Sequence, residues 1–176
     1  MDLNRYTEKA QQALAQAQRL ASEYNHAQIE PEHLLLALVD QADGVVPQVV
    51  AKLGATPQQL KRQLEEELQR KPQVYGTATQ VGIGATLQNV LNRAEAQAQS
   101  MHDEFVSTEH LLMGLVLAPA GRASELLQQL GISLNRIYEA LASIRGTQNR
   151  LALPSLQQRP SSTPKSRAAR EARLCS

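Results

Sequence analysis

A glutamate followed directly by a histidine occurs twice in the chain, at Glu32-His33 and at Glu109-His110. Carboxylate and imidazole groups are common zinc ligands and common acid–base groups in enzymes. A helical zinc site, however, needs a second histidine one turn further along, as in H-E-x-x-H. The fourth residue after the histidine is alanine in one pair and glycine in the other. We therefore expect no metal site.

Other catalytic chemistry also lacks its residues. A phosphate-binding loop would read G-x-x-x-x-G-K-[ST], and the closest stretch, GIGAT at residues 82–86, has no lysine after its glycines. No Ser/His/Asp arrangement can be identified. The single cysteine, Cys175, can form no internal disulfide and no cysteine-rich metal site. We expect no catalytic residues, no cofactor and no enzymatic activity from this chain.

The two Glu-His pairs belong to a longer repeat. The segment IEPEHLLLALV at residues 29–39 returns as VSTEHLLMGLV at residues 106–116. The alignment that places residue 29 on residue 106, called the repeat register below, also places Leu53-Gly54 on Leu130-Gly131. It holds without a gap over roughly 60 residues, and such a register is a strong sign of internal duplication.

Each copy of the repeat predicts four helices. Apolar residues at i, i+3 and i+4 spacing mark the first helix of each copy. Proline or threonine opens the second helix, at Pro31 and Thr108, and glycine ends the third, at Gly54 and Gly131. The second copy is expected to stop at Gly146. The apolar positions of the two first helices are Tyr6, Ala10, Ala13, Leu14, Ala17, Ala21 and Tyr24, and Leu87, Val90, Leu91, Ala94, Ala98 and Met101.

These elements predict an all-α protein. It should contain two tandem four-helix repeats related by approximate two-fold symmetry, followed by a disordered tail. The segments are repeat one at 1–70, a Pro- and Gly-containing linker at 71–83, repeat two at 84–149, and the tail at 150–176. The tail is rich in Pro, Ser and Arg, so it cannot bury enough apolar surface to order alone. We expect a groove along the seam between the repeats.

Charge separates the helical part from the tail. Residues 1–146 hold 12 basic and 16 acidic residues, a net charge of −4, whereas residues 147–176 carry a net charge of +5. A flexible basic segment binds nucleic acid nonspecifically at most, and base-stacking aromatic residues are absent from it. We therefore expect a solvated tail and no nucleic-acid partner.

Membrane insertion is not expected either. The longest strongly apolar run, residues 34–39, is far shorter than the ~20 residues that span a bilayer. The N-terminus opens an amphipathic helix and lacks the apolar block of a signal peptide. We expect a soluble, cytoplasmic protein.

Several motifs together resemble a known family. The opening YTEKAQQALAQAQRLA, the doubled EHLLLALV and EHLLMGLV, the pair LGATPQQL and LGISLNRI, and the closing IRGTQ resemble the N-terminal domain of the Clp ATPases. The resemblance covers residues 1–149. The stretches RKPQVYGT and IRGTQ are most similar to the ClpB disaggregase branch, and TEHLLMGL is also similar to the ClpC branch.

The resemblance implies a helical domain at the mouth of a hexameric AAA+ ring. In that family the domain captures unfolded or aggregated polypeptides, or adaptor proteins, and passes them to the ATP-driven pore, as part of protein disaggregation in the stress response. In the ClpB branch a polar patch beside an apolar groove does this, and Thr7, Asp103 and Glu109 match the patch while Leu91 matches a groove position. His110 completes the predicted polypeptide-binding set, although it stands where the branch often has an apolar residue.

The ClpC branch implies a different ligand. There, paired Thr-Glu-His motifs present glutamates toward phosphorylated arginine, and Glu32 and Glu109 match those glutamates. Pro31 replaces the threonine of the first motif, so we do not expect recognition of arginine phosphate.

Two functions follow from these patterns. The first is a non-catalytic polypeptide-binding domain of a ClpB-like ATP-dependent chaperone. The alternative is a stand-alone regulatory or scaffold protein that binds a Clp ring or an adaptor and whose basic tail contacts nucleic acid or an acidic surface. After RGTQ the family continues into ATPase modules, whereas this chain turns into the basic tail and ends. We therefore expect a monomer. A reading frame that runs on into a P-loop would favour the first function.

Overall fold

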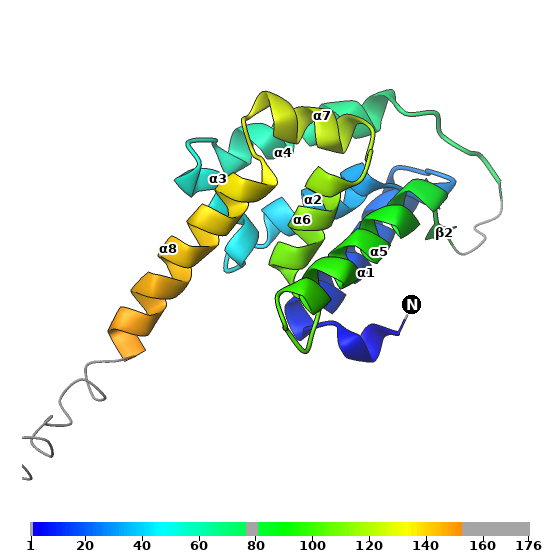
Figure 1. Ribbon diagram of the computed structural model, residues 1–176. Coiled ribbons are helices and arrows are strands. Elements are labelled where there is room, and N and C mark those ends of the chain that lie inside the picture. Colours follow the sequence, from blue (N-terminus) through cyan, green and yellow to red (C-terminus); the bar gives the residue numbers. More distant parts are fainter. Residues whose placement is uncertain (1, 77–80, 153–176) are drawn as a thin grey trace, which may run out of the picture. The chain divides into compact units, whose positions relative to one another are not determined.

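The computed structural model describes residues 2–76 and 81–152, and these are mainly helical (Figure 1). The first copy contains four helices and one short strand, the second copy likewise, and a 3-10 helix opens the chain. In chain order the elements are η1 (Leu3–Arg5), α1 (Glu8–Glu23), β1 (Gln28–Ile29), α2 (Pro31–Asp40), α3 (Val45–Lys52), α4 (Pro57–Arg70), β2 (Gly82–Ile83), α5 (Ala85–Ser100), α6 (Thr108–Leu117), α7 (Arg122–Gln129) and α8 (Leu134–Ala152).

The bounds of the helices confirm the duplication. In the repeat register, α5, α6 and α7 begin and end at the same positions as α1, α2 and α3, and α8 begins at the same position as α4. Glycine follows α3 and α7 as predicted, since Gly54 and Gly131 adopt positive φ values of 88° and 72°. Both the all-α class and the tandem four-helix repeats predicted from the sequence are therefore confirmed.

The last helix is longer than predicted. It continues past Gly146, where the second copy was expected to stop, and includes residues 150–152 of the predicted tail. No proline occurs between Leu134 and Pro154, so the backbone hydrogen bonds of the helix can continue. The rest of the predicted tail, residues 153–176, lies outside the described residues. The chain divides into two compact units, residues 1–140 and 141–176, and of the second unit the structure describes the C-terminal part of α8.

Two apolar helices, α2 and α6, form the centre of the first unit (Figure 1). Every residue from Pro31 to Val39 is buried, and so are seven of the ten residues of α6. Helices that are apolar on all sides are stable only when other elements surround them. The amphipathic helices α1 and α5 supply part of this cover, since α1 packs against α2 and α5 against α6.

The two copies are joined by a pair of short parallel contacts. Ile29 of β1 pairs with Ile83 of β2, and Tyr6 pairs with Val106 in an isolated bridge. The repeat register exchanges the two pairs, because Tyr6 corresponds to Ile83 and Ile29 to Val106. Such an exchange is the mark of approximate two-fold symmetry, which is thereby confirmed.

One helix contact is closer in the second copy than an alanine would allow. A Cβ atom added to Gly114 of α6 would lie 2.4 Å from the backbone oxygen of Val90 in α5. The first copy has Ala37 at the corresponding position of α2. The two copies thus share their helices, but α5 and α6 can pack more closely than α1 and α2.

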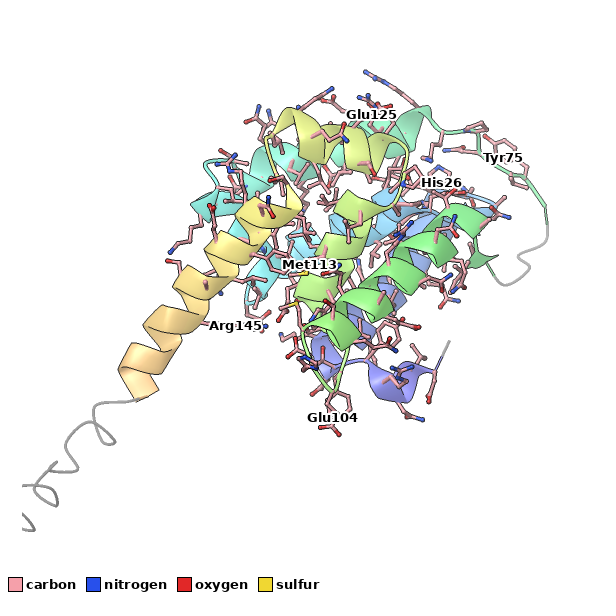
Figure 2. All side chains as sticks on the ribbon, in the orientation of Figure 1. His26, Tyr75, Glu104, Met113, Glu125 and Arg145 are labelled. Carbon is pink, nitrogen blue, oxygen red and sulfur yellow. The ribbon has the colours of Figure 1, made fainter. Side chains whose placement is uncertain are left out.

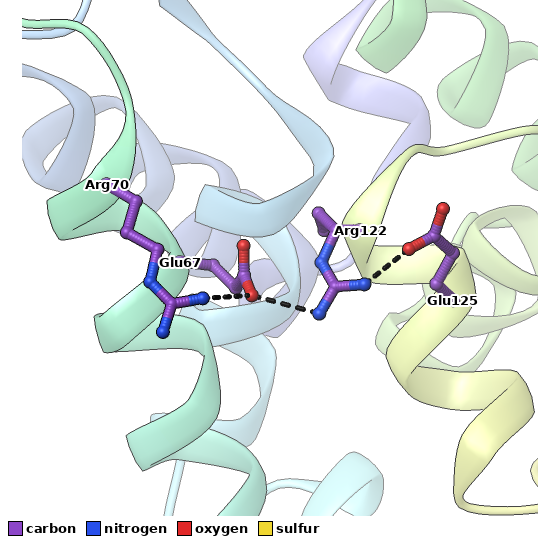
Figure 3. A network of polar contacts seen from close by, with 4 residues as sticks. All are labelled: Glu67, Arg70, Arg122 and Glu125. Atoms are coloured by element: carbon purple, nitrogen blue, oxygen red, sulfur yellow. Dashed lines mark hydrogen bonds and ion pairs between the residues drawn. The ribbon is translucent and has the colours of Figure 1, made fainter.

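A surface network of ion pairs links α7 of the second copy to α4 of the first (Figure 3). One guanidinium nitrogen of Arg122 lies 2.9 Å from Glu67 and the other 2.5 Å from Glu125. Arg70 approaches the same Glu67 oxygen at 3.5 Å. Because the Arg122 side chain is 41% exposed, water and salt screen these pairs, and they contribute little to stability.

Within the described ranges, no single helix is long and apolar enough to cross a membrane. Helices α2 and α3, which are bent by 90° relative to each other, pass the test for a membrane span together, by length and composition only.

Candidate functional site

Thr7, the first residue of the predicted patch, holds the start of α1. Its hydroxyl oxygen accepts a hydrogen bond from the Ala10 backbone N–H at 3.3 Å, which is the usual role of an N-cap threonine. Its own backbone N–H donates to the Val106 carbonyl oxygen at 2.9 Å. This bond places Thr7 next to the segment that carries the other polar residues of the patch.

His110 lies in the first turn of α6 and is only 1% exposed. Its Nδ1 accepts the backbone N–H of Ser107 at 2.9 Å, and its Nε2 lies 2.8 Å from Asp103 Oδ2. Because Nδ1 accepts a hydrogen bond, the ring proton is on Nε2, which donates to the carboxylate. The histidine thus returns to the N-cap backbone as the glutamate of a capping box does.

His33 makes the same backbone contact in the first copy, with a different partner beyond it. Its Nδ1 accepts the Glu30 backbone N–H at 2.8 Å, and its Nε2 lies 2.7 Å from Nδ1 of His26. His26, labelled in Figure 2, lies in the loop after α1 and corresponds to Asp103 in the repeat register. Its ring stacks on Tyr24 with a centroid distance of 5.6 Å.

Burial keeps both histidines of the first copy neutral. It lowers the pKa of His33 to about 4, with a smaller contribution from the neighbouring His26 ring, and it also lowers the pKa of His26. His33 then donates its Nε2 proton to His26. The pair is a structural junction between the loop and α2, as is the His110–Asp103 pair in the second copy.

The glutamates of the two Glu-His pairs also lie in different surroundings. Glu32 is 3% exposed and its carboxylate lies 3.5 Å from the Lys71 ammonium, whereas Glu109 is half-buried. Nowhere among residues 2–76 and 81–152 do three or more His, Cys, Asp or Glu side chains form a group that could hold a metal ion. The histidines serve helix capping in both copies.

The predicted polypeptide-binding residues are brought together only in part. Leu91 is 0% exposed and His110 is 1% exposed, so neither side chain reaches solvent in this conformation. Thr7 and Glu109 are half-buried, and the Asp103 side chain is 34% exposed. These three line one region where α1 begins beside the 103–110 segment. The role of all five residues in polypeptide binding stays a prediction.

An apolar groove lies in the first unit between η1, α1 and β2, and residues of both repeats line it, as expected for a groove along the seam between them. Its volume is about 280 Å³. Leu3 and Ile83 are 46% and 36% exposed, so apolar side chains reach its mouth. The sequence predicts residues 81–83 to be part of the linker. In the structure β2 pairs with β1, and residues 81–83 line one side of the groove. The groove is lined by Leu3, Gln11, Leu14, Ala15, Gln18, Ile29, Val81, Gly82, Ile83 and Leu87.

The corresponding place, beside α5 of the second copy, is occupied by Tyr6, because the edge of each groove is the segment that precedes the first helix of the other copy. There Tyr6 replaces Ile83 and is 2% exposed, and its hydroxyl donates to Glu95 Oε1 at 2.8 Å. Burial and this hydrogen bond to a carboxylate raise the pKa of the Tyr6 hydroxyl. Leu91 is fully buried, while its counterpart Leu14 is 9% exposed and lines the open groove. The groove that the structure describes thus includes Leu14, the counterpart of Leu91, while a binding role for Leu91 itself stays a prediction.

Comparison with known proteins agrees with this fold. Residues 5–130 match the family described as the Clp repeat (R) N-terminal domain. The chaperone protein ClpB of Nitratidesulfovibrio vulgaris is 35% identical over 152 residues, which cover 84% of this chain and 18% of that protein. The curated ClpB relatives are much longer than this chain, which spans only 16–18% of the length of those it matches.

Solved structures show the same architecture. The Hsp104 N-terminal domain from Candida albicans has a TM-score of 0.69 at 20% identity, over 80% of this chain and 91% of that one. A ClpV N-domain in complex with a VipB peptide has a TM-score of 0.55 at 17% identity, over 75% of this chain and 91% of that one. With the duplicated helices, the paired strands and the sequence match all in agreement, this chain belongs to the family of Clp repeat N-terminal domains.

Proposed function

We propose that this domain binds polypeptide segments, from unfolded or aggregated proteins or from adaptors, on behalf of a ClpB-like ATP-dependent chaperone. The observation that carries the proposal is the apolar groove between η1, α1 and β2, whose mouth exposes Leu3 and Ile83. A concave apolar surface with a few polar groups at its edge is the usual form of a binding site.

The size of the groove suits weak and unselective capture. A volume of about 280 Å³ holds one or two side chains rather than a long segment. Burying one large apolar side chain gains roughly 1.5–3 kcal/mol. Contacts of this strength suit a domain that must take many sequences and release them again. Several copies around a hexameric ring would raise the capture through effective concentration.

Acidic groups beside α1 would extend the contact. Asp103 and Glu109, with Thr7, are the polar residues that the family resemblance assigns to binding, and all three are at least partly exposed. Residues 1–146 carry a net charge of −4, which favours segments with basic residues. The proposed site therefore combines the apolar groove with an acidic patch near the start of α1.

A structural relative supports binding of polypeptide in general. The ClpV N-domain was solved with a VipB peptide bound, and it shares this fold. The relation to ClpB chaperones rests on 35% identity over 152 residues. Together they favour a polypeptide over a small molecule or a nucleic acid as the partner of this chain.

A binding experiment tests the proposal. The ¹⁵N-labelled chain is titrated with a reduced and alkylated protein that stays unfolded, and with the native form of the same protein as a control. We expect saturable shifts of groove amides such as Leu14 and Ile83 with the unfolded form only.

Two variants refine that experiment. Ile83→Asp places a charge in the groove and should weaken binding, whereas Val74→Asp changes an apolar residue that is 55% exposed and outside the groove lining. If binding is saturable and neither variant weakens it, the binding site lies outside this groove. An absence of any shift with the unfolded protein would refute the proposed function.

A further inference from the structure

We propose that the groove between η1, α1 and β2 is a binding site for a tyrosine side chain of the partner polypeptide. This inference rests on the proposed function and names the side chain that the groove selects. The chain itself supplies the reason, because the symmetric groove of the second copy is filled by a tyrosine.

The two grooves are built alike. At the groove beside α1 the Gly84 backbone N–H donates to the Ile29 carbonyl at 3.1 Å, and at the corresponding place beside α5 the Thr7 N–H donates to the Val106 carbonyl at 2.9 Å. The repeat register relates these two pairs to each other. The strand at the edge of each groove therefore has the same position relative to the helix opposite it, and each groove continues the interface between the copies.

Several side chains differ between them, since Tyr6, Ala10 and Glu95 beside α5 correspond to Ile83, Leu87 and Gln18 beside α1. Tyr6 lies on the edge segment beside α5, and its hydroxyl donates to Glu95 on that helix. Ile83, which corresponds to Tyr6, is shorter and leaves the groove of about 280 Å³ open. Leu14 and Ile29 remain at its floor. A phenol ring entering from solvent would cover the apolar surface that Tyr6 covers in the second copy.

One residue of the groove lining can accept a hydrogen bond from the tyrosine hydroxyl. Gln18 lines the groove and corresponds to Glu95 in the repeat register. Its amide oxygen is an acceptor, as the Glu95 carboxylate oxygen is for Tyr6. A neutral acceptor forms a weaker hydrogen bond than a carboxylate does. We therefore expect the groove to prefer tyrosine over phenylalanine by a small factor and both aromatics over small polar residues by a large one.

A peptide series measures this preference directly. The probes are Gly/Ser peptides with one central Tyr, Phe, Leu or Ser, titrated into the full chain and followed by ¹⁵N shifts of groove amides. We expect the Tyr peptide to bind about tenfold or more tightly than the Ser peptide and a few times more tightly than the Phe peptide.

Variants of Gln18 test the hydroxyl contact. Gln18→Glu copies the acceptor of the second copy and should raise the ratio of Tyr to Phe affinity, whereas Gln18→Leu should bring that ratio close to one. Both changes lie on the exposed face of α1, where they leave the fold intact. Ala15→Arg, also in the lining and exposed, should weaken all peptides together.

The outcomes separate this inference from the proposed function. If the unfolded protein shifts the groove amides but the Tyr and Ser peptides bind equally, the tyrosine site is overturned and the binding domain stands. If Gln18→Glu leaves the Tyr to Phe ratio unchanged, the hydroxyl contact is overturned. If the unfolded protein does not bind at all, both proposals fall.

Discussion

The first and second copies of the repeat share their backbone and differ in the side chains that complete it. Helix bounds, strand pairings and the capping histidines correspond between the copies. In the first copy a groove remains open beside Ile83, whereas Tyr6 closes the second. The two copies thus share the contacts that position the backbone, while their side chains at the seam differ.

The helix junctions show the same division. His33 and His110 both accept an N-cap backbone N–H, and they then contact His26 and Asp103 respectively. The first pair is buried and neutral, while the Asp103 side chain is 34% exposed. One junction therefore depends on excluding charge, and the other keeps a carboxylate in contact with water.

Replacing the capping histidines should have the largest effect on stability, and the effect should differ between the two copies. His33→Ala removes a fully buried ring and its backbone contact and leaves His26 Nδ1 without its donor. We expect a loss of about 3–4 kcal/mol in the free energy of unfolding. His110→Ala should lose less, about 2–3 kcal/mol, because water can solvate Asp103. Urea unfolding measures both, and a larger loss for His110→Ala would reverse the assignment of the two junctions.

Acid should weaken the first copy through its histidine pair. The folded pKa of His33 is about 4, below the ordinary value of 6.5 that applies to the unfolded chain. Its contribution to stability is thus complete above pH 6.5 and is lost as the pH falls toward 4, by up to about 3 kcal/mol. Unfolding by urea between pH 7 and pH 4.5 checks the sign.

The variant His26→Asp gives the first copy the partner of the second and serves as the matched test. A carboxylate beside His33 favours the imidazolium form, so the pKa of His33 should rise. Proton NMR titration of the His33 ring would show it. A pKa that stays at about 4 in this variant would mean that burial alone controls the ring.

Exchanging the small residues at the helix contacts should have an intermediate effect. Gly114→Ala brings a methyl group against the Val90 carbonyl at 2.4 Å, so the backbones must separate, at a cost of about 1–3 kcal/mol. Ala37→Gly in the first copy should lose only about 1 kcal/mol, mainly through helix propensity. Thermal unfolding compares the two variants. A stabilising Gly114→Ala change would show that α5 and α6 are not in close contact.

The ion pairs between the copies should contribute least. Arg122→Gln removes the contacts to Glu67 and Glu125, and the Arg122 side chain is exposed to water. We expect the smallest loss of stability in this series, and one that shrinks further in high salt. Urea unfolding at low and high salt is the measurement. A loss as large as that of His110→Ala would mean that this network, rather than α2 and α6, holds the copies together.

Much of the fold could be predicted from the sequence, because helix periodicity and the glycines after α3 and α7 are local signals. The repeat register then placed the same helices in both copies. The end of α8 differs from the prediction, because the helix continues through Gly146 and no proline follows before Pro154. Glycine alone inside a helical pattern weakens a helix without ending it.

The candidate site could be predicted only in outline. The groove depends on β2. Its two residues have the composition of a linker, and their pairing with β1 is seen only in the structure. The contact between His26 and His33 depends on the loop turn at Asn25, which has a φ of 55°. Such contacts join residues through the tertiary structure and leave no periodic signal. The register could still have shown that Ile83 and Tyr6 occupy equivalent positions.

One variant decides whether the open groove of the first copy is where polypeptide binds. Ile83→Tyr gives the first copy the residue that closes the second. Titration of this variant with the unfolded protein, beside the unchanged chain, should show at least about a tenfold loss of affinity with the helical fold retained. Unchanged affinity in a folded Ile83→Tyr protein would show that polypeptide binds elsewhere.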